Sequence, residues 1–185
     1  MIARGLTAAL LLAAALVVCG CSAATEASLS GSSTYGRIVS VADGDTVDVQ
    51  LGSGATHSVR LLAMDSPEKY ATRYGSPDEC GALVASAFMG RFDGRRVVLI
   101  SDPTQDSVDH YGRLLRYVRL PGGKDLGGAE VARGLAMPYL FDTPAHRYAR
   151  YVRAAEAARA AGRGTWGPAC DGDFHSSVPG AQNGL

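Results

Sequence analysis

The sequence predicts one domain of the α+β class, mainly β, built as a small five-stranded β-barrel with three α-helices. Five short segments have the β-branched or alternating apolar pattern of strands, and turn residues separate the first three of them. Three longer segments instead repeat apolar residues at three- and four-residue steps, which is the period of a helix. Residues 36–170 carry all of these elements and are numerous enough for one hydrophobic core.

The strands are expected at residues 36–42, 46–51, 56–63, 96–100 and 112–120. Asp-Gly-Asp separates the first two, and Gly-Ser-Gly at 52–54 is a good hairpin signal between the second and the third. The fourth segment is wholly apolar, whereas the fifth alternates with imperfectly sorted faces.

The helices are expected at residues 79–92, 125–136 and 144–163. The apolar set of the second consists of Leu126, Ala129, Val131 and Leu135. Pro144 suits the first turn of the third helix, and Gly162 suits its stop. Arginines recur at three-residue steps along this helix, which favours a solvated face over a nucleic-acid stripe. They are Arg147, Arg150, Arg153 and Arg159.

The first 20 residues have the pattern of a secretory signal, with a basic start, an apolar run and small residues before Cys21. The run is too short for a comfortable membrane-spanning helix. The segment VCGC resembles a bacterial lipobox, which predicts a lipid-anchored protein on the cell surface, with Cys21 as the acylated residue. An ordinary cleaved signal peptide is the alternative. Residues 21–35 are expected to be a flexible tether and residues 171–185 a disordered tail.

Two cysteines, Cys80 and Cys170, belong to the mature domain once Cys19 leaves with the signal and Cys21 carries lipid. An exported domain with two such cysteines most simply joins them in a disulfide. A metal-binding role is less favoured, because neither has a His or Cys partner at ligand spacing.

The charge is balanced, with 18 basic and 18 acidic residues in the whole chain. This excludes a protein that holds nucleic acid by a strongly basic global field. Nucleic-acid binding would need a local cluster of charge and a metal. The sequence does not define an oligomer interface, and a monomer is expected.

Chemistry-bearing residues gather in DGDT, residues 43–46, and VRLLAMDSPE, residues 59–68, at the ends of predicted strands. The carboxylates of Asp45 and Asp65 would make an oxygen-rich site for Ca²⁺ or Mg²⁺. Glu68 could act as a base, and Arg60 is a natural partner for a phosphate. Each feature alone is more simply a turn or a solvated arginine. Together they favour metal-dependent phosphodiester hydrolysis.

The motifs DGDT, RLLAMDSPE and DHYGR, the last at residues 109–113, resemble the signature of the staphylococcal-nuclease-like (thermonuclease) family. The resemblance covers about residues 36–166 and implies an OB-fold, Ca²⁺-dependent phosphodiesterase acting on DNA and RNA and leaving 3′-phosphates. It implies metal ligands from the side chains of Asp45 and Asp65 and from the backbone carbonyl of Ser66, with Asp43 nearby. It also implies Glu68 as the general base and two arginines on the phosphate, Arg60 and Arg113.

Aromatic residues complete the resemblance. Tyr111 lies where the family contacts the substrate base or phosphate, and His110 replaces the prototype's lysine beside it. Tyr139 and Phe141 lie near the prototype's pair of pocket tyrosines and would stack on a base, with core packing as the alternative.

Two non-catalytic alternatives use the same fold class. A nucleic-acid-binding OB module on a surface lipoprotein would be expected to have lost some of the five key charged residues, and all five are present. A surface protein with structural Ca²⁺ would explain the carboxylates but not the two arginines.

Overall fold

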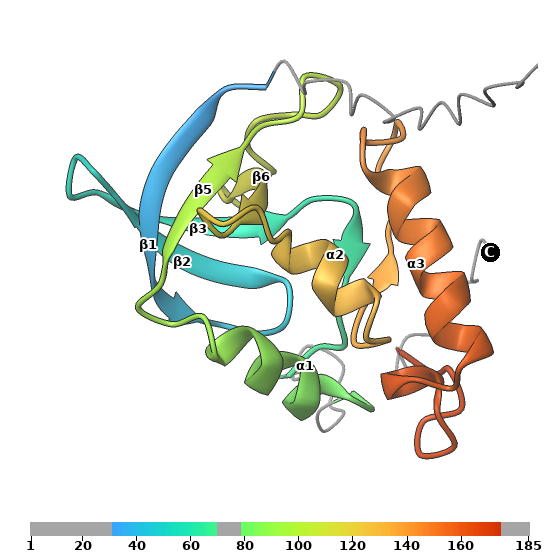
Figure 1. The fold of residues 1–185 in the computed structure, drawn as a ribbon. Coiled ribbons are helices and arrows are strands. Elements are labelled where there is room, and N and C mark those ends of the chain that lie inside the picture. Colours follow the sequence, from blue (N-terminus) through green and yellow to red (C-terminus); the bar gives the residue numbers. More distant parts are fainter. Residues whose placement is uncertain (1–30, 70–78, 175–185) are drawn as a thin grey trace, which may run out of the picture.

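The computed structural model describes residues 31–69 and 79–174, and its centre is a closed five-stranded barrel with the strand order β1-β2-β3-β6-β5 (Figure 1). The barrel strands are β1 Ser33–Val41, β2 Thr46–Leu51, β3 Thr56–Leu61, β5 Arg96–Ile100 and β6 Leu114–Arg119. Neighbouring strands are antiparallel except β3 and β6, which run parallel. The predicted small barrel is therefore confirmed.

Alternation along the strands fills the barrel. Val47 and Val49 of β2 and Val59 and Leu61 of β3 are buried, as expected for residues that share one face of a pleated sheet. Register irregularity in β1 between Ile38 and Ser40 leaves the intervening valine exposed.

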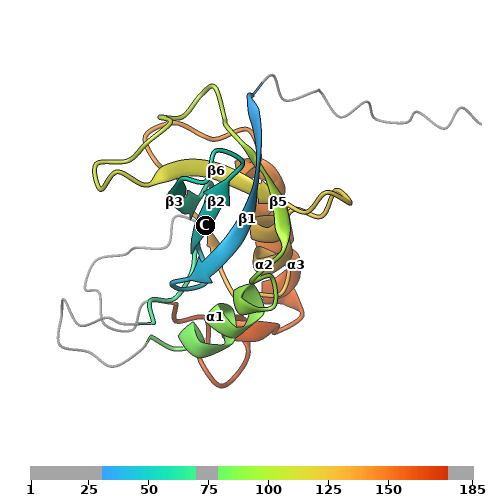
Figure 2. The same cartoon turned by 90° about the vertical axis from the view of Figure 1, so that its left-hand side faces the viewer.

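Three helices lie against the barrel: α1 Ala82–Gly90, α2 Leu126–Val131 and α3 Tyr148–Ala160. Figure 1 shows α1 below the barrel, and Figure 2 shows α2 and α3 side by side behind it. A short 3₁₀ turn, Gly164–Trp166, follows α3. Among the described residues, the structure contains no helix with the length and apolar character needed to cross a membrane.

All three helices are shorter than predicted. At the start of α3 the N–H groups of His146 and Arg147 donate to Asp102 and to the Tyr117 hydroxyl, at 2.7 Å and 3.0 Å. These tertiary acceptors stand in for a side-chain cap and place the helix start after Pro144 rather than at it.

A buried polar network supports this junction. Asp102 accepts from the Tyr117 hydroxyl at 2.7 Å and lies 2.6 Å from His146 Nδ1. Although burial opposes ionisation, hydrogen bonds from Tyr117, Thr104 and His146 hold the pKa of Asp102 well below its usual value. The ionised form of Asp102 is therefore more stable in the native protein than in the unfolded chain.

The predicted solvated arginine face is wrong for Arg147, which is largely covered, whereas Arg150 is exposed as predicted. Arg147 and Arg150 form ion pairs with Asp125, just before α2, at 2.9 Å and 2.5 Å. The Arg147 guanidinium also lies 4.2 Å from the Tyr117 ring centroid. These side chains attach α3 to α2 and to the barrel.

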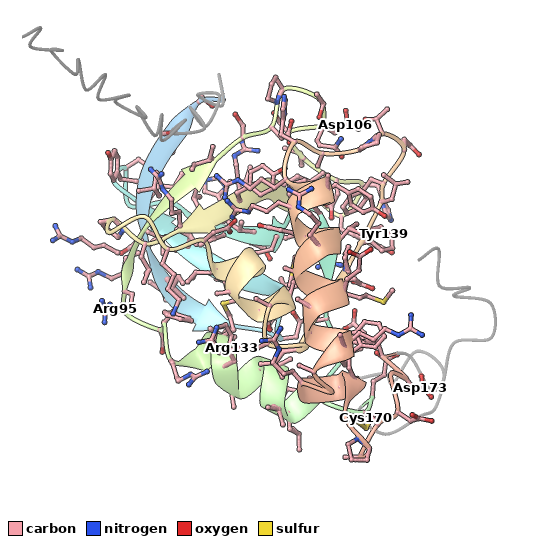
Figure 3. The ribbon with its side chains drawn as sticks, turned by 45° about the vertical axis from the view of Figure 1, so that its right-hand side comes forward. Arg95, Asp106, Arg133, Tyr139, Cys170 and Asp173 are labelled. Atoms are coloured by element: carbon pink, nitrogen blue, oxygen red, sulfur yellow. A yellow bond between two sulfur atoms is a disulfide. The ribbon has the colours of Figure 1, made fainter. Side chains whose placement is uncertain are left out.

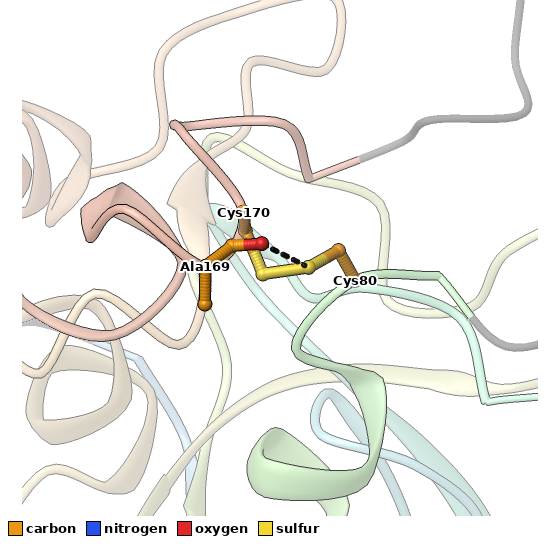
Figure 4. Close-up of a disulfide and its surroundings, with 3 residues drawn as sticks. All are labelled: Cys80, Ala169 and Cys170. Atoms are coloured by element: carbon orange, nitrogen blue, oxygen red, sulfur yellow. Dashed lines mark hydrogen bonds between the residues drawn. A yellow bond between two sulfur atoms is a disulfide. The ribbon is translucent and has the colours of Figure 1, made fainter.

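The predicted disulfide is present, and Cys80 and Cys170 have Cα atoms 5.7 Å apart (Figure 4). The Cys80 sulfur also lies 3.7 Å from the Ala169 carbonyl oxygen. The bond ties the segment before α1 to the chain after α3, across a sequence separation of 90 residues.

The predicted domain boundaries differ from the structure at both ends. The strand β1 begins at Ser33, inside the predicted tether, because residues 33–37 pair with β5. Phe174, in the predicted tail, is buried against Trp166, with ring centroids 4.8 Å apart. The predicted signal and Cys21 lie outside the described residues, as does the tail beyond residue 174.

Candidate active site

Two loops meet at the candidate site, one that joins β1 to β2 and one that follows β3. Asp43 organises the first, since its Oδ1 accepts from the N–H groups of Asp45 at 3.1 Å and Thr46 at 2.8 Å. The Leu61 N–H donates to the Asp45 carbonyl at 2.8 Å, which fixes this loop beside the end of β3. The two motifs, which are separate in the sequence, are therefore in contact.

A left-handed residue then reverses the chain after β3. Ala63 has φ 63° and is fully buried, an uncommon conformation for a residue with a side chain. It leads into β4, Met64–Asp65, which pairs with β7, Met137–Pro138. Residues 137–138 thus form a short strand, and this pairing fixes the position of Asp65.

The Arg60 guanidinium bridges the two predicted metal-binding carboxylates. Its Nη1 lies 2.5 Å from Asp45 Oδ2, and its Nη2 donates to Asp65 Oδ1. Asp45 also accepts from the Ser66 N–H at 2.8 Å and from the hydroxyls of Ser66 and Thr46 at 3.2 Å and 3.0 Å. Asp45 and Arg60 are both buried. Sequence-distant residues therefore form one charged cluster.

The electrostatics of this cluster favour positive charge within it. Burial alone would lower the pKa of Arg60, but the carboxylates of Asp45 and Asp65 raise it. Burial, with repulsion from Asp45 and Glu68, raises the pKa of Asp43 to about 7. Repulsion among the carboxylates therefore adds to burial at Asp43, and the same carboxylates stabilise the charged form of Arg60.

Glu68 lies at the exposed rim of the cluster and is held by a residue that the sequence analysis missed. Its N–H donates to Glu79 Oε2 at 2.7 Å, and the Glu79 N–H donates back to its carbonyl at 3.0 Å. Glu79 is buried and precedes the disulfide-bonded Cys80. Partial desolvation, with repulsion from Asp45 and Asp65, raises the pKa of Glu68. A raised pKa strengthens a carboxylate as a base.

Arg113 lies immediately before β6, two residues ahead of Leu115, which pairs with Arg60 of β3. Asp109 orients Arg113 by accepting from its Nε at 2.8 Å and from its N–H at 2.9 Å. Burial would raise the pKa of Asp109, but these bonds hold it below its usual value.

A cavity of about 590 Å³ opens beside Arg113. Tyr139 and Phe141 form one wall, with ring centroids 4.8 Å apart, and Figure 3 shows Tyr139 on the same side of the molecule as Asp106. Tyr111 does not line the cavity. It is largely exposed, with its ring centroid 5.2 Å from the Arg113 guanidinium. The structure therefore groups Tyr139 with Arg113 inside the cavity and leaves Tyr111 at its outer side.

The sequence that forms this site is similar to that of known proteins. Residues 58–168 match the family model described as staphylococcal nuclease homologue, which is more than half of the chain. The protein belongs to the staphylococcal nuclease family. The matched range contains Arg60, Asp65, Ser66, Glu68 and Arg113, and it begins after Asp45.

Several curated proteins are similar in sequence to parts of this chain. An uncharacterized protein of Bacillus anthracis is 35% identical over 45% of this chain and 37% of its own length. An uncharacterized endonuclease of Escherichia coli is 36% identical over 57% of this chain and 61% of its own. A Methanocaldococcus jannaschii protein is 29% identical over 50% of this chain and 51% of its own. The chain therefore spans less than two thirds of each relative.

The nuclease family uses Ca²⁺, and the oxygen donors of this cluster suit that ion. In residues 31–69 and 79–174 there is no group of three or more His, Cys, Asp or Glu side chains arranged around one metal position. The candidate set consists instead of two carboxylates, Asp45 and Asp65, next to the Ser66 backbone. These hard oxygen donors fit Ca²⁺, and the Arg60 guanidinium that pairs with both carboxylates would compete with the ion for them.

A second acidic residue missed by the sequence analysis lies directly under the nuclease motif. Glu130 of α2 is 0% exposed, and a Cβ built on Gly44 would be 2.7 Å from its Oε1. Burial, with repulsion from Asp45 and Asp43, raises the pKa of Glu130 well above its usual value. One signal was present in the sequence, since Glu130 lies four residues after Leu126 and so shares its helix face.

Proposed function

We propose that this protein is a calcium-dependent nuclease that hydrolyses phosphodiester bonds in DNA and RNA and leaves 3′-phosphates. The observation that carries the proposal is the cluster in which the Arg60 guanidinium joins Asp45 and Asp65 next to Ser66. It combines oxygen ligands for a hard cation with a phosphate-binding group, and hydrolysis of a phosphodiester needs both.

Each residue has a distinct part in the proposed reaction. Glu68 orients a water molecule for in-line attack and takes its proton, helped by a raised pKa. Arg60 and Arg113 bind the phosphate and neutralise the charge that develops in the five-coordinate transition state. Calcium, held by Asp45, Asp65 and the Ser66 carbonyl, would supply positive charge beside a phosphate oxygen.

The aromatic cavity supports a broad substrate range. Tyr139 and Phe141 offer ring faces next to Arg113, and stacking accepts any base. DNA and RNA are therefore both proposed as substrates, with Tyr139 as the stacking residue and Tyr111 as an outer contact.

We further propose that the protein is exported and attached to the membrane through a lipid on Cys21. The lipobox-like VCGC motif supports this, as does the disulfide of the folded domain, which suits an oxidising compartment. Replacing Cys21 with Ala should abolish lipid labelling and release the protein from membranes. A protein that stays membrane-bound without Cys21 would contradict the anchor.

The proposed reaction is tested with circular single-stranded DNA and an RNA oligonucleotide in Ca²⁺. Internal cleavage of both is expected, with product ends that a polymerase extends only after phosphatase treatment, because a 3′-phosphate blocks extension. Products that are extended directly would contradict the stated cleavage position. Salt-sensitive binding without cleavage would instead favour the non-catalytic OB module.

A further inference from the structure

The exposed side of α1 is apolar, although a surface helix normally turns polar residues to solvent. Leu83 and Val84 are 60% and 59% exposed, and Ala87 and Gly90, which follow on the same side of the helix, are exposed as well. The one polar side chain of the helix, Ser86, is instead buried. These four exposed residues form an apolar stripe, and adjoining exposed apolar side chains often mark a protein or membrane contact.

Cations lie at the end of the apolar stripe. Arg91 comes directly after the stripe, with its guanidinium 4.5 Å from the centroid of the Phe88 ring. The Arg133 guanidinium lies 4.8 Å from the same centroid. The Lys124 Nζ lies 5.4 Å from the centroid of the Phe92 ring, which packs edge-on against Phe88. Three cations from different parts of the chain therefore gather around two neighbouring rings.

Three further arginines extend this positive surface onto the barrel. Arg37 of β1 is the register partner of Arg96 of β5, and it donates to the Gly94 carbonyl at 2.5 Å, next to Arg95. All three are exposed, and like charges directly opposite each other weaken a pair of strands. The turn between α1 and β5 has a single acid, Asp93, which accepts from the Gly94 N–H at 2.8 Å. The basic cluster consists of Arg37, Arg91, Arg95, Arg96, Lys124 and Arg133.

The basic cluster is not neutralised within the protein. Across residues 31–69 and 79–174, none of the ion pairs includes any of its six members. The whole chain has equal numbers of basic and acidic residues, so this surface is a local excess of positive charge. Its partner should therefore carry many negative charges.

The apolar stripe distinguishes between the two common polyanionic partners. The phosphate backbone of a nucleic acid offers nothing to aliphatic side chains such as Leu83 and Val84. The surface of a bilayer accepts both groups, because anionic headgroups attract the cations and the acyl boundary receives the apolar side chains. Figure 3 shows Arg95 and Arg133 toward the α1 end of the molecule and Tyr139, which lines the cavity, toward the other side. Contact through α1 would leave the cavity open to substrate.

We propose that the apolar stripe of α1 and the basic cluster bind the surface of membranes that contain anionic phospholipids. Leu83 and Val84 enter the boundary between headgroups and acyl chains, and the arginines lie among the lipid phosphates. This surface is separate from the nuclease site, and its binding requires neither catalysis nor a lipid on Cys21.

Co-sedimentation with lipid vesicles tests the proposal. All proteins carry Cys21→Ala, so that a lipid anchor does not contribute to binding. One vesicle type contains equal parts of phosphatidylcholine and phosphatidylglycerol, and the other contains phosphatidylcholine alone. The parent protein should bind the second type at least about tenfold more weakly, because that surface carries no net negative charge to attract the basic cluster.

Two double variants examine the two parts of the surface. Leu83→Gln/Val84→Gln keeps good helix formers and should weaken binding to anionic vesicles by about tenfold or more, since it removes the side chains that enter the acyl boundary. Arg95→Gln/Arg96→Gln should weaken it by about 25-fold, at about fivefold for each basic residue near an anionic surface.

The matched control is Arg153→Gln/Arg163→Gln, which removes two exposed arginines outside the basic cluster. It should bind anionic vesicles as the parent protein does, and all variants should keep the parent circular dichroism spectrum and the parent cleavage rate in solution. Equal binding of the parent to both vesicle types, or parent affinity in either test variant, would overturn the proposal. A DNA oligonucleotide bound more weakly by Arg95→Gln/Arg96→Gln, with no vesicle binding by the parent, would assign the cluster to nucleic acid and overturn it as well.

Discussion

Replacing both disulfide cysteines with serine is expected to cost the protein much of its stability. The bond joins residues separated by 90 positions, so it restricts the unfolded chain strongly. The loop-closure relation for that length gives about 4.6 kcal/mol at 25 °C as an upper value. For a domain of this size such a loss lowers the midpoint of thermal unfolding by about 10–20 °C.

The same change should also affect the position of Glu68, the proposed general base. Cys80 follows Glu79, whose carboxylate and N–H hold the backbone of Glu68. Freeing this segment from Cys170 lets Glu68 move relative to Asp65. Because a displacement of about 1 Å can cost up to a hundredfold in rate, we expect cleavage to slow by about tenfold or more while the domain stays folded.

Urea unfolding with and without a reductant provides the assay. Reduced wild type should coincide with the Cys80→Ser/Cys170→Ser variant, and the variant should not respond to reductant. Cleavage is compared at a temperature where circular dichroism shows both proteins folded. Equal unfolding midpoints for oxidised and reduced wild type would refute the stability argument. Equal cleavage rates would refute the link to Glu68.

Three further predictions concern the charged groups. Arg60→Ala should slow cleavage by about a hundredfold or more without weakening calcium binding, because the guanidinium no longer competes for Asp45 and Asp65; calorimetry showing weaker binding would contradict this competition. Cleavage should decline as pH falls through the raised pKa of Glu68, above its usual value of about 4.3, since only the deprotonated form accepts a proton. A pH–rate profile with its acid limb unchanged in Glu68→Gln would exclude this role. Asp102→Asn should cost about 2–4 kcal/mol in urea unfolding at neutral pH. The native pKa of Asp102 is depressed, so this difference should be present above the unfolded pKa of about 3.9 and shrink as pH falls below it; a constant difference across that range would contradict the sign.

The sequence predicted the barrel well because the patterns that specify strands and hairpin turns lie within a few neighbouring residues. Alternation at Val47 and Val49 and the Gly-Ser-Gly turn specify strands and a hairpin within a few residues. The helix ends were less predictable, since the start of α3 depends on Asp102 and Tyr117, which are distant in sequence.

The candidate site was only partly predictable for a related reason. The motifs identify Asp45, Arg60 and Asp65 by residue type and order. Sequence patterns do not reveal that the guanidinium bridges both carboxylates, or that Glu79 holds Glu68 across a loop. An acid within an apolar helix face is a detectable signal, but its position beneath Gly44 depends on tertiary packing.

The most direct test of the central claim is cleavage of single-stranded DNA by the purified protein in Ca²⁺, in EDTA, and by Glu68→Gln in Ca²⁺. The proposed mechanism predicts rapid cleavage in the first case, none with EDTA until calcium is restored, and a rate reduced by about a hundredfold or more in the variant. Cleavage that persists in EDTA, or that proceeds at the wild-type rate in Glu68→Gln, would contradict it.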